Sequence, residues 1–132
     1  MEHPSEWYDI TFQMIMINYY IQTINGYQYD NGSPENHYYK KLEKPIYKEY
    51  YIENYKFNIN HKYLIVLWDI EKIEKTNQNK YPSNIKLLIK YLDDHKDNIK
   101  IFPSPRIIKL LNEVIDNQNN TISILNQYYN TN

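Results

Sequence analysis

The clearest local pattern in the sequence is the segment Asn98-Ile99-Lys100-Ile101-Phe102-Pro103-Ser104-Pro105-Arg106-Ile107-Ile108-Lys109-Leu110-Leu111-Asn112. Ser104 is able to accept a hydrogen bond from a free N–H group of a first helical turn, and Pro105 suits the first helical position, where no N–H is needed. Apolar residues then recur at helical spacing as far as Ile115. The segment therefore predicts a short strand at residues 99–102, followed by a helix from Pro105 to Ile115.

The spacing of apolar residues predicts further helices. In residues 10–24 the apolar positions are separated alternately by four and three residues, and Asn25-Gly26 then supplies a helix stop. The first apolar residues of this stretch also alternate, which leaves a strand as the alternative. We expect a short helix at residues 34–43, ended by Pro45, and another helix at residues 83–92.

The middle of the chain has strand patterns. Residues 51–59 alternate between apolar or aromatic and polar side chains, which predicts a half-buried strand, and Asn60-His61 is expected to form a hairpin turn. Residues 63–68 are apolar on both faces, so we expect a central strand covered on each side. Because a helix separates this strand from the one at residues 99–102, the two are expected to pair in parallel through a crossover.

Together these elements predict an α+β fold. We expect a small mixed sheet, made of a hairpin and a strand–helix–strand unit and packed with three to four helices, with a further edge strand at residues 121–125. A chain of 132 residues is long enough to form one domain with its own core. Within a single domain at 1–132, we expect an acidic helical part at 1–45, an α/β part at 46–126 and a frayed tail at 127–132.

The composition indicates an AT-rich genome. Isoleucine, asparagine, lysine and tyrosine dominate, with 16 tyrosines, and alanine is absent. The codons of these residues are rich in A and T, which is typical of a virus, plasmid, organelle or parasite. The absence of cysteine excludes disulfides, thiolate catalysis and cysteine-ligated metal.

The charge is close to balanced but unevenly distributed. The formal net charge is −1, whereas domains that only bind duplex DNA are usually clearly basic. Residues 1–35 contain five acidic side chains and no lysine or arginine, so the remainder carries a net charge of +4, which suits docking against a charged partner. No signal peptide or run of transmembrane length is evident. We therefore expect a soluble cytoplasmic protein with no membrane partner.

The sequence offers little sign of catalytic or metal chemistry. The four histidines are far apart, and no two have the spacing that makes a ligand pair on a helix. They are His3, His37, His61 and His95. Solvated histidines and no metal site are therefore expected. Neither glycine lies between a strand and a helix in a phosphate-binding loop, so no cofactor is expected.

One enzymatic alternative remains open. Asp69 follows the predicted central strand, and open α/β sheets place ligand-binding carboxylates at that end of a strand. Asp93 and Asp94 would supply further carboxylates for a metal ion. A small nucleotide-binding enzyme centred on Asp69 is thus an alternative, beside the simpler interpretation of a strand-ending aspartate.

The predicted helix start at residue 104 is a candidate contact site. Ser104 and Pro105 leave free N–H groups that bind phosphate at many helix N-termini, although simple capping accounts for the same residues. Arg106 is the only arginine in a chain rich in lysine. This choice is typical of a bidentate or stacked contact that lysine does not make.

A belt of tyrosines and lysines between residues 38 and 56 is the second candidate surface. Its main members are Tyr39, Lys40, Lys41, Tyr51 and Lys56. Tyrosines can stack on unpaired bases while lysines follow the backbone of a single strand. Tyrosine is equally typical of protein interfaces, and the interleaved glutamates favour a protein partner over nucleic acid.

The helix start also carries a family resemblance. Residues 105–112 and 119–125 resemble the segment after the trigger loop in the largest subunit of multisubunit RNA polymerases. That family has a proline-arginine pair opening an apolar helix, an asparagine-bearing loop, and a threonine leading into an apolar strand. The whole chain also resembles the small RNA polymerase subunit encoded by AT-rich linear cytoplasmic plasmids of yeasts.

The resemblance implies a non-catalytic small subunit of a DNA-directed RNA polymerase, bound to a large catalytic subunit, with DNA or RNA in the complex. The catalytic aspartate triplet of such polymerases is absent, so the chain is not expected to be an enzyme on its own. Pro105, Arg106 and Thr121 are the positions that the resemblance assigns to a structural or template-adjacent segment. Lys109 departs from the family, which tends to have glutamate there.

Overall fold

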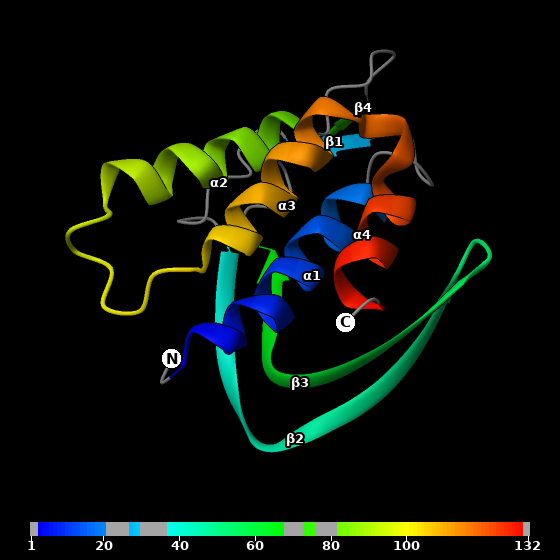
Figure 1. The fold of residues 1–132 in the computed structure, drawn as a ribbon, viewed down its shortest axis with the longest axis horizontal. Helices are drawn as coiled ribbons and strands as arrows, with labels where there is room; N and C mark the ends of the chain where they lie inside the picture. The colour runs from blue at the N-terminus through cyan, green and yellow to red at the C-terminus, as the bar shows by residue number, and fades with distance from the viewer. Residues whose placement is uncertain (1–2, 21–26, 30–36, 68–72, 76–81, 131–132) are drawn as a thin grey trace.

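The computed structural model describes residues 3–20, 27–29, 37–67, 73–75 and 82–130. The chain has an α+β fold, as predicted, with helices gathered on one side of a long bent hairpin (Figure 1). The elements in order are η1 (Pro4–Glu6), α1 (Trp7–Tyr19), β1 (Tyr27–Tyr29), β2 (His37–Ile52), β3 (Tyr55–Leu67), β4 (Ile73–Lys75), α2 (Pro82–Asp94), α3 (Pro105–Asp116), η5 (Gln118–Asn120) and α4 (Thr121–Tyr129).

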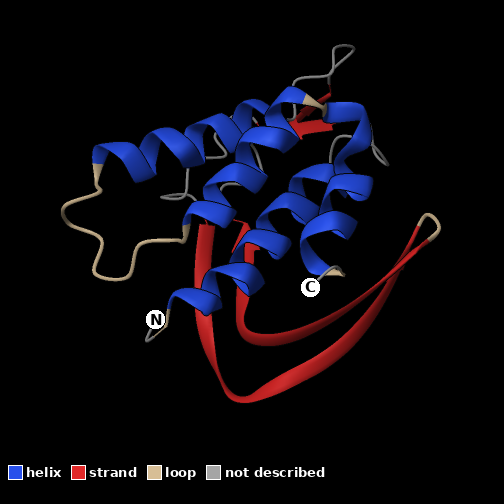
Figure 2. Cartoon of the chain, in the orientation of Figure 1, coloured by secondary structure: helices blue, strands red, loops and turns tan. Residues whose placement is uncertain are grey.

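The described strands form two antiparallel pairs, β1 with β4 and β2 with β3 (Figure 2). The long hairpin turns at residues 53–54, where Glu53 has a positive φ of 55°. The Tyr19 hydroxyl donates a hydrogen bond to Glu53 Oε1 at 3.0 Å, which links α1 to this turn. Burial and then this hydrogen bond raise the pKa of Tyr19 to about 12.

The hairpin bends sharply at a β-bulge, where β2 has more residues than β3 between two consecutive paired positions. Lys41 pairs with Tyr63 and Ile46 pairs with His61, so residues 42–45 of β2 lie opposite Lys62 alone. We call the paired residues on the two sides of this bulge the proximal arm (37–41 with 63–67) and the distal arm (46–52 with 55–61). The bulge bends both strands, and the helices occupy the concave side (Figure 1).

Helix α1 is the centre of the core. It contacts β3 and α3, while α3 also contacts α2 and α4. The buried residues of α1 are consecutive around the helix and not confined to one stripe, as expected for a helix enclosed by other elements. The Phe12 ring lies 5.4 Å from Tyr50, 5.6 Å from Phe57 and 5.3 Å from Tyr129, so it joins the hairpin to α4.

The predicted strand–helix–strand unit is wrong. Residues 99–102 are not a strand, and β3 pairs with β2 alone in the described part of the sheet. The physical reason is that side chains of α1 hydrogen-bond to the edge of β3 that a parallel strand would need. Residues 99–104 form a loop instead, anchored by a 2.8 Å hydrogen bond that Trp7 Nε1 donates to the Ile101 carbonyl.

Two predictions around the hairpin are also wrong. From residue 37 onward, the expected helix at 34–43 is part of β2, because these residues pair with β3. Asn60-His61 lies within β3, and the turn is at 53–54. The alternation over 51–59 predicted a single strand, but these residues span the turn and belong to both β2 and β3. Tyr51 on β2 faces outward, whereas Phe57 on β3 faces the core.

The expected edge strand at 121–125 is the start of α4, and the tail expected to fray from 127 is helical to Tyr129. The buried positions in this stretch have helical spacing. They are Thr121, Ile122, Ile124, Leu125 and Tyr128. The Tyr129 hydroxyl donates a 2.7 Å hydrogen bond to the Tyr8 carbonyl, which fixes the end of α4 against α1.

The remaining helix predictions are confirmed where the structure describes them. The helix expected at 10–24 is α1 as far as Tyr19, residues 21–24 lie outside the described ranges, and the strand alternative is wrong. Helix α2 covers the expected 83–92. Each described helix is too short or too polar to cross a bilayer.

Helix α3 begins as predicted, with Pro105 in its first turn and the Ser104 hydroxyl accepting a hydrogen bond from Ile107 N at 3.4 Å. Replacing Ser104 with alanine should lower the free energy of unfolding by about 1 kcal/mol, because the cap is lost. Urea denaturation measures this change. The matched control is Asn120→Ala, since Asn120 precedes α4 without a side-chain capping bond. Equal effects of the two substitutions would contradict the capping role.

Tyr129 makes stability sensitive to alkali. Burial is the main cause that raises its pKa well above the ordinary value of 10.0. Above about pH 10 the unfolded phenol ionises while the folded one keeps its proton, so stability falls as pH rises. Tyr129→Phe removes this contribution and should make the fall shallower in urea unfolding measured across a pH series. An unchanged pH dependence would refute this assignment.

Candidate functional site

Among the described residues, a dense polar cluster joins α1 to β3 at the bend of the hairpin. Asp9 Oδ2 accepts hydrogen bonds from the backbone N–H groups of Lys62 (2.8 Å) and Tyr63 (3.1 Å). Lys62 is the residue opposite the bulge of β2, so its N–H is left without a regular partner in the ladder. The carboxylate of Asp9 therefore satisfies the backbone at the point where the sheet pairing is interrupted.

Gln13, one helical turn further along α1, continues this pattern. Its Oε1 accepts a hydrogen bond from Ile65 N at 3.0 Å, and its Nε2 donates to the Tyr63 carbonyl at 2.8 Å. These are the bonds that a neighbouring strand would make. Glu6, one turn before Asp9, accepts a hydrogen bond from the Tyr63 hydroxyl at 2.8 Å. Asp9 and Gln13 of α1 thus substitute for a third strand along the β3 backbone.

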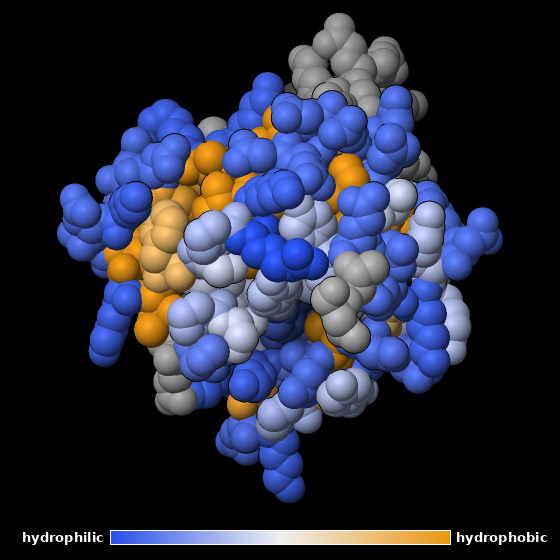
Figure 3. All heavy atoms as spheres, in the orientation of Figure 1, coloured by the Kyte–Doolittle hydropathy of each residue, from blue (hydrophilic) through white to orange (hydrophobic). Residues whose placement is uncertain are grey.

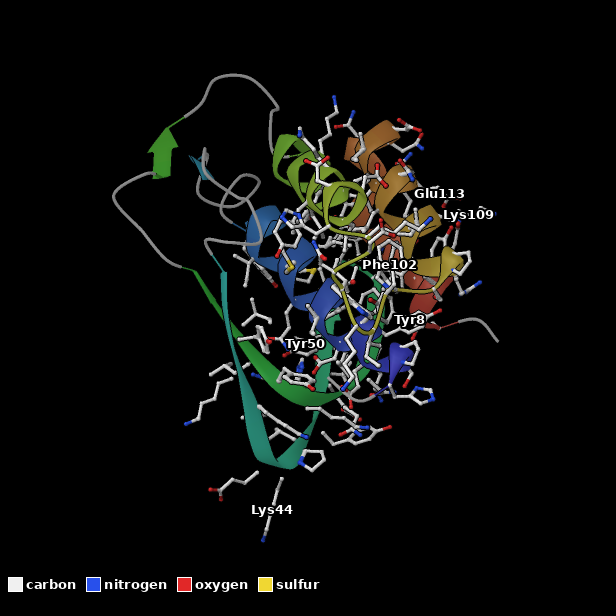
Figure 4. All side chains as sticks on the ribbon, turned by 90° about the vertical axis from the view of Figure 1, so that its left-hand side faces the viewer. Tyr8, Lys44, Tyr50, Phe102, Lys109 and Glu113 are labelled. Carbon is white, nitrogen blue, oxygen red and sulfur yellow. The ribbon has the colours of Figure 1, made fainter. Side chains whose placement is uncertain are left out.

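His61 connects this cluster to the distal arm. Its Nδ1 lies 2.6 Å from Asp9 Oδ1, and its Nε2 lies 2.6 Å from the Tyr50 hydroxyl. His61 is only 7% exposed, so the expectation of a solvated histidine is wrong for this residue. If the strand predicted over residues 51–59 is continued to residue 61, with no turn at Asn60-His61, the same alternation places His61 on the inner face. Figure 4 shows Tyr50 between the hairpin and α1.

A carboxylate, an imidazole and a hydroxyl in line resemble a catalytic relay, but Asp9 and both ring nitrogens of His61 are engaged within the protein. Asp9 accepts two bonds at each oxygen, the fourth from Gln13 Nε2 at 2.7 Å to Oδ1. Burial, followed by the charge of Asp9, raises the pKa of Tyr50, so its phenol stays protonated at neutral pH. The cluster therefore holds the fold together. Among the described residues, no three histidine or acidic side chains meet as a metal site.

The residues predicted as a contact site at the start of α3 cap this helix and contact α4. Ser104 caps α3, and the Arg106 guanidinium lies 4.7 Å from the centre of the Tyr128 ring on α4. A cation–π contact, which arginine makes more often than lysine, explains why arginine stands here in a lysine-rich chain. Thr121 is buried, so it is not placed to contact a template. Residues 121–125 also form a helix, where the resemblance to polymerases implied a strand.

The predicted tyrosine-lysine belt lies on the β2–β3 hairpin but is divided between its two arms and two faces. Tyr39 is on the proximal arm, 64% exposed, with its ring 5.8 Å from the buried Tyr63. Tyr51 is on the distal arm and 71% exposed, with Lys56 Nζ 5.8 Å from its ring centre. Lys40 and Lys41 are exposed between them in the chain.

Asp69, the candidate residue of the enzymatic alternative, lies outside the described residues.

An apolar groove of about 400 Å³ opens between α1, α2, the proximal arm and the loop before α3. It is lined by Trp7, Ile10, Met14, Tyr39, Ile65, Leu88, Tyr91, Leu92, Ile99, Lys100 and Ile101. Figure 3 shows apolar surface below α2, where this loop runs. The groove was not predicted from the sequence, because the apolar Ile99 and Ile101 have the pattern of a strand.

Comparison with known proteins finds similarity to a viral protein. The chain is 44% identical over 138 residues to an uncharacterized protein of Acanthamoeba polyphaga mimivirus. The alignment covers 98% of this chain and 50% of the mimivirus protein, so the chain spans about half the length of that relative. A virus is one of the sources that the AT-rich composition indicates. No protein-family profile matches the sequence, and no solved structure matches it.

The structural role of Asp9 leads to a stability prediction. Asp9→Asn leaves one oxygen where the carboxylate has two acceptors, so its NH2 group must face either the two backbone donors or Gln13 Nε2, and we expect a loss of about 3 kcal/mol of unfolding free energy. The control is Asp93→Asn, an exposed carboxylate on α2 that should change stability by less than about 0.5 kcal/mol. Urea denaturation of both variants measures the difference. Similar losses would show that the network contributes little.

Proposed function

We propose that this chain is a non-catalytic binding protein that docks onto a larger protein through the apolar groove. The observation that carries the proposal is the exposed Tyr39 at the edge of a groove whose lining is largely apolar and aromatic. Aromatic residues are enriched where protein interfaces gain most of their binding free energy. The occupant is therefore an apolar segment of the partner chain.

The state of the polar cluster supports a binding role. Asp9 and His61 are the buried groups best suited to acid–base chemistry, and both are engaged by protein partners on every side described above. The enzymatic alternative centred on Asp69 remains a separate prediction, because that residue lies outside the described ranges. A nucleotide that raises the thermal stability of the wild type, but not that of Asp69→Asn, would support this alternative.

The partner that we propose is the large catalytic subunit of a DNA-directed RNA polymerase encoded by the same AT-rich genome, with the complex working in the cytoplasm. This choice rests on the sequence resemblance around Pro105 and Arg106. The helical conformation of residues 121–125 gives it no support from that part of the chain. The groove and the choice of partner are therefore tested separately.

The first test mixes the purified chain with the purified large polymerase subunit and measures the complex by size-exclusion chromatography and calorimetry. We expect Tyr39→Glu to weaken binding by at least roughly tenfold, since it places a charge at the edge of an apolar contact. Tyr47→Glu is the matched control, because Tyr47 is also exposed but lies on the distal arm.

Two results would contradict the proposal. A wild-type chain that forms no complex with the large subunit refutes the proposed partner. A complex that tolerates Tyr39→Glu but is lost with Tyr47→Glu refutes the groove as the docking site. Circular dichroism of each variant establishes that the substitutions leave the fold intact, as expected for exposed side chains.

A further inference from the structure

The outer face of the distal arm is a second surface, separate from the groove. On this face Tyr47, Glu49 and Tyr51 of β2 alternate with inward-facing residues. They pair across the hairpin with Asn60, Asn58 and Lys56. The opposite face carries the buried Phe57 and Ile59, which pack into the core. In the described part of the chain, the outer face is left open to solvent.

Among the described residues, the most exposed aromatic side chains lie on the hairpin. Tyr47 is 74% exposed and Tyr51 is 71% exposed. They are four residues apart on one strand and on the same face, which separates them by about 13 Å along the strand. The two exposed phenol rings have Glu49 between them on β2, and Asn58 and Asn60 lie beside them on β3. The rings form a platform on which unpaired bases can stack.

The charge of the hairpin fits a polyanion. Residues 37–67 contain six lysines and three glutamates, whereas the whole chain has a net charge of −1. The glutamate on the outer face, Glu49, is paired with Lys56 at 3.2 Å. Lys44 at the bend points away from the body of the protein (Figure 4). The hairpin as a whole therefore has an excess of three lysines over glutamates, and the one carboxylate of the outer face is neutralised by Lys56.

We propose that the outer face of the distal arm binds single-stranded nucleic acid. Tyr47 and Tyr51 stack on bases, and lysines of the hairpin contact the phosphates. A single strand fits better than a duplex because the rings can stack only on bases that are exposed. The excess of lysine over glutamate in the hairpin favours nucleic acid over a protein partner here. The surface is distinct from the groove that carries the proposed protein docking.

The test measures binding of a fluorescein-labelled 12-nucleotide oligo(dT) and of oligo(U) by fluorescence anisotropy. We expect the double variant Tyr47→Ala/Tyr51→Ala to lose at least roughly tenfold in affinity, whereas the double phenylalanine variant keeps stacking and stays within about threefold of wild type. Affinity should also fall as salt rises from about 50 to 200 mM, and a duplex of equal length should bind more weakly.

Tyr39→Ala is the matched control, because it removes an exposed tyrosine of the same hairpin from the groove side, and it should leave oligonucleotide binding unchanged. Undetectable binding of both oligonucleotides, or equal affinities of the wild type and the double alanine variant, would overturn the proposal. So would a double alanine variant that keeps the oligonucleotide but loses a protein partner. Because Tyr39→Glu tests the groove and Tyr47/Tyr51 test the outer face, failure of one proposal is distinguishable from failure of the other.

Discussion

The contact between the Asp9 carboxylate and the bend of the hairpin is the constraint on which the rest of the fold depends. A bulge of four residues in β2 leaves the backbone of β3 without regular pairing at Lys62, and the carboxylate replaces the missing acceptors. The same carboxylate binds His61, which in turn binds Tyr50 on the other strand. Helix α1 is thereby fixed in the concave side of the hairpin, where Phe12 meets rings from β2, β3 and α4.

The sequence was sufficient to predict elements whose signals are local. The start of α3 followed from Ser104 and Pro105, and α1 and α2 followed from apolar spacing. Strand pairing was not predictable in the same way, because it depends on which distant groups supply hydrogen bonds. The apolar residues at 99–102 look like a strand, yet the β3 edge that they would join is occupied by Asp9 and Gln13.

The candidate surfaces were predictable in part. The tyrosine-lysine belt was apparent from composition, and the structure places it on the hairpin. Its division into two faces was not predictable, because the bulge at 42–45 changes which residues face the core on its two sides. The groove was missed altogether, since it is assembled from four segments that are far apart in the chain. Arg106 was singled out as unusual, but the ring that it contacts, Tyr128, lies in a segment that was expected to fray.

The use of helical side chains along β3 has a consequence for self-association. An exposed strand edge is a template on which another chain can add a strand, and such addition leads to aggregation. Asp9 and Gln13 block this edge on the proximal arm, and Asn130 Nδ2 donates a 2.7 Å hydrogen bond to the Lys56 carbonyl on the distal arm. On β2, lysines and Pro45 discourage the same addition. Because α1 precedes the hairpin in the chain, the helix that blocks β3 is already synthesised when that strand emerges from the ribosome.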